Sequence, residues 1–232
     1  MESLPSKFKS LKLTAVNKVE LADQEYDFDK LDDNYVVVKM QAAGLGPYDL
    51  GFIVGRIKSK LENFNVGCEG AGKIVKIGKN VDQSLLGTRV GFLADYNDPK
   101  CIRSYAEYAV IHKSSVVKLP DNVSSEQGAY LLGNPLTALC IYDYIVKSKD
   151  AKAIVIDTAA SALSKMINRL CAKDNIQVIN IVRKEENIKL LQDVGIEHIL
   201  NSASSTFNKD FEDLSSKIQP SIYISFLGGP FP

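Results

Sequence analysis

The sequence has no excess of charge of either sign. Its 232 residues carry 28 Lys and Arg against 28 Asp and Glu, so the formal net charge is zero, and no run of five like charges occurs. A balanced chain has no global field that would draw it onto nucleic acid or an anionic membrane. We therefore expect no nucleic-acid partner.

Long apolar runs are also missing. None approaches the roughly 20 residues that a membrane-spanning helix needs, so we expect no membrane span. The N-terminal segment 1–12 lacks the apolar core of a secretory signal. Because it carries Lys7, Lys9 and Lys12 beside Glu2, a mitochondrial presequence stays open as an alternative. We expect a cytoplasmic protein, with a mitochondrial location as the alternative.

Cysteine and histidine are scarce. The four cysteines are widely spaced and form no CxxC pair; they are Cys68, Cys101, Cys140 and Cys171. This spacing argues against a disulfide framework and against a cysteine-rich zinc site. His112 and His198 stand among apolar, strand-like residues with no recognisable Asp or Ser partner. We interpret both as structural or surface histidines.

The first half of the chain is typical of β structure. Its short apolar or alternating segments, separated by turn residues, are 35–40, 72–78, 89–93, 105–110 and 115–119. Many short strands at such spacing predict a barrel or sandwich. We assign residues 1–123 to this first domain.

The second half, residues 124–232, has a different pattern. Ser124 can cap a helix whose apolar pattern runs to Ile145, and Pro135 should break or kink that helix. Beyond it, strands are expected at 153–156, 178–182, 199–200 and 222–226, and helices at 162–172, 185–194 and 207–218. Apolar strands alternating with helices predict a parallel sheet with right-handed crossovers.

The turn after the first of these parallel strands is a candidate nucleotide site. A dinucleotide pyrophosphate binds at this turn, against the free N–H groups of the following helix. The turn contains small residues but no glycine, and hydroxyls recur at Thr158, Ser161 and Ser164. The predicted contacts are Thr158, Ala160, Ser161, Ala162, Leu163 and Ser164. The alternative is a capped helix that binds nothing.

Two basic residues follow the second parallel strand. Arg183 and Lys184 stand where a ribose-recognition residue is expected, about one strand–helix–strand unit beyond the turn. Basic side chains there suit a 2′-phosphate, which favours NADPH over NADH. The alternative is a solvated start of the next helix.

Several segments together resemble one family. They are AAGLGPYDL (42–50), GCEGAGKIV (67–75), GTRV (87–90), YAEY (105–108), LPDNV (119–123) and NPLTA (134–138). In this order they are similar to the medium-chain dehydrogenase/reductases, especially the zinc-independent quinone oxidoreductase and enoyl reductase branch. The resemblance extends from about Val36 to Gly229.

The resemblance implies a GroES-like β-barrel domain followed by a Rossmann domain. It also implies hydride transfer from NADPH to a quinone or an enone. Tyr48 would donate a hydrogen bond to the developing oxyanion, and Asn134 and Thr137 would line the nicotinamide site. For Tyr48, ordinary loop packing is the alternative; for Asn134 and Thr137, it is helix capping around Pro135.

Zinc-dependent members of the family hold their catalytic metal with Cys, His and Cys. Here Gly46 and Cys68 occupy the first two of these positions, and the third falls in segment 132–135, which has neither Cys nor His. One thiol does not make a zinc site. We expect no metal, and we interpret Cys68 as a small buried residue in a tight turn.

Three features weaken the expectation of activity. They are the absence of glycine from the turn, the departure of segment Ser225–Gly229 from the family pattern after the fourth strand, and the low number of strands. A full Rossmann sheet has six strands, and only four are recognisable here, as in a C-terminally truncated domain. The alternative function is therefore a catalytically inactive relative that serves as a structural subunit of a larger assembly. An open parallel edge also predicts a protein partner or an oligomer that covers it.

Overall fold

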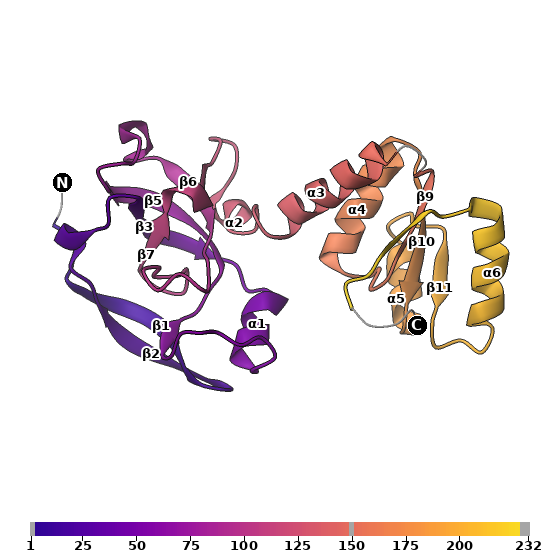
Figure 1. Cartoon of the computed structure of the whole chain (residues 1–232), viewed down its shortest axis with the longest axis horizontal. Helices are drawn as coiled ribbons and strands as arrows, with labels where there is room; N and C mark the ends of the chain where they lie inside the picture. The colour runs from indigo at the N-terminus through magenta and orange to yellow at the C-terminus, as the bar shows by residue number, and fades with distance from the viewer. Residues whose placement is uncertain (1–2, 149–150, 228–232) are drawn as a thin grey trace. The chain divides into compact units, whose positions relative to one another are not determined.

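The computed structural model describes residues 3–148 and 151–227 and contains two compact units. Unit 1 comprises Met1–Gly133 and unit 2 comprises Asn134–Pro232. Figure 1 shows unit 1 in indigo to magenta and unit 2 in orange to yellow. Each unit has its own sheets and its own core, so each is described by itself.

The main sheet of unit 1 has five strands in the order β7-β3-β5-β6-β8, all antiparallel. Their bounds are β3 Tyr35–Ala43, β5 Glu69–Ile77, β6 Arg89–Leu93, β7 Tyr108–His112 and β8 Val116–Lys118. The core on one face contains Val36, Ile74 and Phe92, each at most 1% exposed. A fully buried side chain of this size contributes about 1.5–3 kcal/mol to stability.

A second antiparallel sheet in unit 1 was not foreseen from the sequence. It has the order β2-β1-β4, with bounds β1 Lys7–Ala15, β2 Lys18–Glu25 and β4 Phe64–Asn65. Along the first part of β1, exposed Lys7 and Lys9 alternate with buried Phe8 and Ser10. Lys7 and Lys9, two of the lysines that suggested a presequence, thus lie on the solvent face of a strand, because successive side chains of a strand point to opposite faces.

Short helical segments complete unit 1. They are α1 Pro47–Ile53, α2 Ser125–Gly128 and three 3-10 turns, Phe28–Lys30, Gln83–Leu85 and Lys113–Ser115. Ser124 caps α2 by accepting a hydrogen bond from the N–H of Gln127. The next helix, α3 Asn134–Lys147, begins only after a gap in helical structure, and Pro135 lies in its first turn. The predicted break at Pro135 is confirmed, because proline is tolerated in a first turn but not inside a helix.

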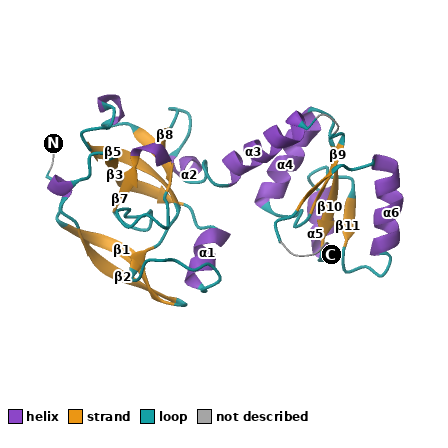
Figure 2. Ribbon diagram, viewed as in Figure 1, coloured by secondary structure: helices purple, strands orange, loops and turns teal. Residues whose placement is uncertain are grey.

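Unit 2 is built on a parallel sheet of four strands in the order β11-β10-β9-β12. Figure 2 labels β9, β10 and β11 of this sheet. The strands are β9 Ala153–Ile156, β10 Gln177–Val182, β11 Ile199–Asn201 and β12 Ile222–Ile224. The helices between them are α4 Ala162–Lys173, α5 Glu185–Gln192 and α6 Phe207–Ile218. The predicted parallel sheet with intervening helices is confirmed, and four strands are found within the described residues.

Helices cover both faces of this sheet. Ile154 and Ile156 of β9 pack with α3 and α4, through residues such as Ile145 and Ile167. The neighbouring Val155 faces the other side and packs with Phe207 of α6. Strands buried on both faces read as continuous apolar runs, which explains why β9 was easy to recognise in the sequence.

Several expected boundaries differ from the structure, and two of the differences have a clear cause in hydrogen bonding. The strand expected at 105–110 is β7 Tyr108–His112, because Tyr105 instead bonds with Val66 and Leu11 across to the other sheet. The strand expected at 222–226 ends at Ile224, and the residues after it bond to a buried aspartate described below. No helix in the described part of the chain is long and apolar enough to span a bilayer.

Candidate functional site

The first candidate region is the segment around α1 in unit 1, where Tyr48 was predicted to act. Its side chain is 50% exposed, and its ring contacts Phe52 and Tyr96 edge-on, with centroid distances of 5.2 and 5.7 Å. Partial burial, followed by the nearby Cys68 and acidic groups, raises the pKa of Tyr48. The phenol therefore stays protonated at neutral pH and can donate a hydrogen bond.

Asp49, the next residue on α1, organises this region from the inside and was not singled out in the sequence. It is 2% exposed. One carboxylate oxygen accepts hydrogen bonds from the Tyr96 hydroxyl at 2.6 Å and the Cys68 N–H at 2.9 Å. The other oxygen accepts from the Gly46 N–H at 3.1 Å. No cation among the described residues forms an ion pair with Asp49, so hydrogen-bond donors such as these compensate for its burial.

Gly67, next to Cys68, allows the chain to pass closely against Ser104 and Tyr105. Its φ is +103°, and an added Cβ would collide with Ser104 and Tyr105. Its N–H donates to the Tyr96 hydroxyl at 2.9 Å. Glycine is required here because its backbone conformation is unfavourable for a residue with a side chain.

Cys68 and Glu69 follow on the same segment. Burial, followed by the negative charges of Asp49 and Glu69, raises the pKa of the Cys68 thiol to about 12. Burial also raises the pKa of Glu69, although the Gly133 N–H donates to its carboxylate. Cys68 is 6% exposed, as expected for a small buried residue, and its thiol is protonated at neutral pH.

The positions that hold the catalytic zinc in zinc-dependent members of the family can be checked residue by residue. Gly46 offers only its backbone, and its N–H is bonded to Asp49. Within residues 3–148 and 151–227, no group of three His, Cys, Asp or Glu side chains is arranged to hold a metal ion. The donor set around Cys68 does not fit zinc, which takes three or four Cys, His or carboxylate ligands.

The second candidate region is the turn between β9 and α4 in unit 2. Ser161 caps α4: its hydroxyl accepts a hydrogen bond from the Ser164 N–H at 3.1 Å. The Ser164 hydroxyl, fully buried, donates to the carbonyl of Thr158 at 3.2 Å. Thr158 has a φ of +46°, an unusual conformation for a β-branched residue. All three predicted hydroxyls thus bond locally, those of Ser161 and Ser164 within the turn and that of Thr158 to the adjacent Asp157 at 3.4 Å.

The start of α4 still presents free donors. The N–H groups of Ala162 and Leu163 have no acceptor among the described residues, whereas that of Ser164 is capped. The first N–H groups of a helix point outward along its axis and attract anions. Ala160, just before the cap, is half-buried. The turn can therefore hold a phosphate group through its backbone.

The structure brings this turn next to the predicted basic residues. The Ala159 N–H donates to the carbonyl of Ile181 at 3.1 Å, two residues before Arg183. Arg183 and Lys184 are both exposed, and Lys184 lies 3.3 Å from Glu186. Arg183 makes no ion pair with any described residue. The exposed guanidinium of Arg183 is thus available to bind an anion near the turn.

Asp157 is a second buried carboxylate that sequence reasoning did not select. It lies at the carboxyl end of β9 and is 1% exposed. It accepts hydrogen bonds from the Ser225 hydroxyl at 2.5 Å, the Phe226 N–H at 2.8 Å and the Tyr223 hydroxyl at 3.0 Å. The available signal was a charged residue directly after four apolar ones. These bonds hold the end of β12 against the turn.

The remaining predicted site residues lie at the start of α3. Asn134 and Thr137 are both exposed, in the first turn of that helix. They belong to unit 2 with the turn and Arg183, whereas Tyr48 belongs to unit 1. Within unit 2, hydrogen bonds link the turn to the strand that precedes Arg183.

Comparisons with known proteins agree with this architecture. Residues 32–121 match the alcohol dehydrogenase GroES-like domain. A Mesorhizobium loti protein assigned as an NADPH:quinone reductase superposes with a TM-score of 0.87 and 30% identity, over 99% of this chain and 70% of that chain. The mycobacterial protein Rv1454c, solved with NADPH, superposes with a TM-score of 0.74 and 21% identity, over 90% of this chain and 63% of that chain.

Curated sequences give a related result. The mitochondrial enoyl-[acyl-carrier-protein] reductase of Caenorhabditis elegans is 26% identical over 178 residues, which are 74% of this chain and 50% of that protein. The chain thus spans about half the length of this curated relative. The antiparallel sheets of unit 1 correspond to the GroES-like fold, and the parallel sheet of unit 2 is Rossmann-like. From these matches, the chain belongs to the quinone oxidoreductase-like branch of the medium-chain dehydrogenase/reductase superfamily.

Proposed function

We propose that this protein is an NADPH-dependent oxidoreductase that reduces a quinone or an activated double bond such as an enone. The observation that carries the proposal is the start of α4, where the free N–H groups of Ala162 and Leu163 lie beside the strand leading to Arg183. NADPH would supply the hydride. We assign unit 1 as the substrate domain and unit 2 as the nucleotide-binding domain.

The residues of the turn fit a pyrophosphate through backbone donors. Ala162 and Leu163 would donate N–H groups, and the small side chains of Thr158, Ala160, Ser161 and Ser164 would shape the surface around them. Arg183 and Lys184 would bind the 2′-phosphate, because a guanidinium can donate two parallel hydrogen bonds to a phosphate. An NADPH-bound relative of the same fold supports this assignment.

The substrate would be reduced in two steps, hydride addition and protonation. A hydride adds to the electrophilic carbon, and a proton neutralises the resulting enolate or quinolate. Tyr48 would donate a hydrogen bond to the developing oxyanion, since its raised pKa keeps the phenol protonated. Asn134 and Thr137, exposed at the start of α3, would bind on the nicotinamide side. No metal is required for this chemistry.

The substitution Arg183→Ala tests the cofactor assignment. Titration of the intact chain, followed by NADPH fluorescence, should show about tenfold weaker NADPH binding, because a charge-assisted bond contributes about 1.5–3 kcal/mol. NADH binding should stay unchanged. Arg169→Ala is the matched control, since exposed Arg169 carries the same charge at the third turn of α4. Failure of the folded wild-type chain to bind NADPH would overturn the proposal.

One observation favours a second candidate, a catalytically inactive relative that acts as a structural subunit. The hydroxyls of Ser161 and Ser164 bond within the turn, and Asp157 places a buried carboxylate at its base. Both features would suit a turn that holds itself together without a ligand. A protein partner or a second copy would then cover an edge strand of the parallel sheet. Absence of NADPH binding together with a stable complex in native mass measurement would favour this candidate.

We also propose a cytoplasmic location, with a mitochondrial one as the alternative. The alternative has support from the enoyl reductase relative, which is named as mitochondrial. Fractionation of cells that express the tagged full-length protein would distinguish the two compartments.

A further inference from the structure

The irregular segment 94–104 of unit 1, called here loop 94–104, is organised around a buried guanidinium. Arg103 is 1% exposed and makes no ion pair with a carboxylate of the described residues. Its guanidinium donates to four carbonyl groups, those of Tyr96 at 3.0 Å, Asp95 at 3.1 Å, Asp98 at 3.2 Å and Asn65 at 3.3 Å. Three of the four lie in the loop itself.

Aromatic rings complete the enclosure of this cation. The guanidinium carbon lies 5.0 Å from the ring centroid of Tyr96 and 5.3 Å from that of Phe64. Carbonyl dipoles and ring faces compensate for the desolvation of a buried charge. A planar fork with five donors can hold several carbonyls in one arrangement, whereas a lysine ammonium offers three donors on a flexible stem. Arg103 therefore fixes the backbone of the loop at Asp95–Asp98.

The loop carries Tyr96, which connects it to the candidate substrate region. The Tyr96 ring stacks on Phe52 of α1 with centroids 4.0 Å apart. Its hydroxyl donates to Asp49 at 2.6 Å and accepts from the Gly67 N–H at 2.9 Å. Tyr96 thus binds both the helix that carries Tyr48 and the segment that carries Cys68.

Tyr48 depends on the same ring. Its own ring contacts only Tyr96 and Phe52 among the aromatic residues described, both edge-on. Asp49, its neighbour on α1, is held by the Tyr96 hydroxyl. A shift of Tyr96 would therefore move the backbone of α1 and the surface against which Tyr48 packs.

We propose that Arg103 and Tyr96 are positioning residues for Tyr48: Arg103 fixes loop 94–104, and Tyr96 transmits that fixed position to Asp49 and α1. This inference rests on the proposed function in so far as Tyr48 is the donor to substrate. The direct contacts of Arg103 and Tyr96 are with the protein, and neither is assigned a contact with substrate or cofactor.

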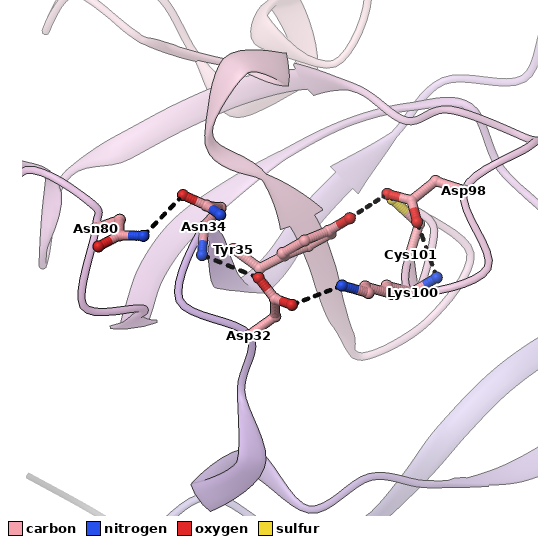
Figure 3. Close-up of polar contacts among 7 residues, drawn as sticks. All are labelled: Asp32, Asn34, Tyr35, Asn80, Asp98, Lys100 and Cys101. Carbon is pink, nitrogen blue, oxygen red and sulfur yellow. Dashed lines mark hydrogen bonds and ion pairs between the residues drawn. The ribbon is translucent and has the colours of Figure 1, made fainter.

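The far side of the loop offers a matched control. The Tyr35 hydroxyl donates to the Asp98 carboxylate (Figure 3). The bond is 2.6 Å long, the same length as the bond from Tyr96 to Asp49. Figure 3 also shows Lys100 paired with Asp32, which ties this side of the loop to the start of β3. Tyr35→Phe removes one hydroxyl-to-carboxylate bond between buried Tyr35 of β3 and the loop. Tyr96→Phe removes one such bond from a buried tyrosine of the loop itself, together with the acceptor of the Gly67 N–H.

The first measurement needs no activity. In a Cys140→Ser background, which removes the exposed thiol, the rate of Cys68 alkylation by N-ethylmaleimide is followed by peptide mass mapping. Tyr96→Phe and Arg103→Lys should accelerate labelling at least tenfold, because the Cys68 N–H is bonded to the carboxylate that Tyr96 holds. Tyr35→Phe should leave the rate within twofold of the parent.

The second measurement separates positioning from general loss of stability. With 9,10-phenanthrenequinone as the probe substrate, Tyr96→Phe should lower kcat at least tenfold and leave the KM for NADPH unchanged, whereas Tyr35→Phe should change neither. Equal effects of Tyr96→Phe and Tyr35→Phe in either measurement would overturn the proposal. If the wild-type protein shows no NADPH turnover, the proposed function fails, and the labelling rates still decide whether Arg103 and Tyr96 hold this region. If the Arg103→Lys variant does not fold, Tyr96→Phe alone is compared with Tyr35→Phe.

Discussion

Two hydrogen bonds within the turn of unit 2 join residues three and six positions apart, whereas two of the three described bonds to Asp49 join residues 19 and 47 positions apart. The turn is closed by Ser161 and Ser164, both at the start of α4. The Asp49 region is closed by loops from three parts of unit 1. A local closure can form with its helix, but a non-local one forms only when the whole unit has folded.

The two regions also differ in how many buried charges they contain, two around Asp49 and one at the turn. Asp49 accepts hydrogen bonds from two backbone N–H groups and one hydroxyl, and Arg103 donates hydrogen bonds to four carbonyl groups. In unit 2, the buried polar groups of the turn are neutral, apart from Asp157 at its base. We therefore expect substitutions in unit 1 to have the larger effects on stability.

The largest effect is expected from Asp49→Ala. Removal of this carboxylate leaves the N–H groups of Gly46 and Cys68 and the Tyr96 hydroxyl without their acceptor. Each unsatisfied buried donor costs about 1–3 kcal/mol, so the free energy of unfolding should fall by about 4 kcal/mol in urea titrations. Asp49→Asn, which keeps one acceptor oxygen, should lose less than half of that. A loss below about 1 kcal/mol for Asp49→Ala would remove the contrast between the units.

The next prediction concerns the pH dependence of the buried Cys68 thiol. Its pKa rises in the folded protein from the ordinary 9.0 to about 12, so the folded state favours the protonated thiol. The stabilisation of the folded state by this pKa difference is complete below about pH 9. It is lost as the pH rises toward 12, because the unfolded state then releases the proton first. As the pH rises from about 8 to about 10, the free energy of unfolding of Cys68→Ala should therefore fall by about 1.4 kcal/mol less than that of the wild type.

Cys140→Ala is the control for that measurement. Cys140 is exposed, so its removal should leave the pH dependence of unfolding unchanged. Urea unfolding at several pH values, followed by circular dichroism, measures both variants. A Cys68→Ala variant with the wild-type pH dependence would contradict the burial of this thiol.

A smaller effect is expected in the turn of unit 2. Ser161→Ala removes the cap of α4, which accepts from the Ser164 N–H, and should lower the free energy of unfolding by about 1 kcal/mol. Exposed Ser205 serves as the control, since Ser205→Ala should change stability by less than about 0.5 kcal/mol. A loss for Ser161→Ala as large as that for Asp49→Ala would show that the turn is as strongly coupled to its unit as the Asp49 region is.

The smallest effect is expected at Thr158. Its φ of +46° costs a residue with a Cβ about 1–2 kcal/mol, whereas glycine adopts it freely. Glycine also gains entropy in the unfolded state, so Thr158→Gly should raise the free energy of unfolding by only about 0.5 kcal/mol. Thr158→Ala, which keeps the Cβ, should show no gain in the same thermal or urea unfolding experiment. A clear loss for Thr158→Gly would mean that the threonine side chain itself supports the turn.

Much of unit 2 was predictable because its signals are local. The apolar run 153–156 is β9 with the same bounds, and the helical spacing at 207–218 is α6. The cap at Ser161 follows from a hydroxyl residue placed just before a helix. By contrast, β1 and β2 were missed, because mixed polar residues such as Lys7 and Lys9 obscure their alternation.

By itself, the sequence determined the change from an antiparallel to a parallel sheet, the turn before α4 and the position of Arg183. These depend on the order of apolar and turn residues along the chain. Only the tertiary structure decided that Asp49, Tyr96 and Arg103 belong together, and that Asp157 holds the end of β12. The physical reason is that a buried charge needs several donors or acceptors from different segments, and only folding brings those segments into contact.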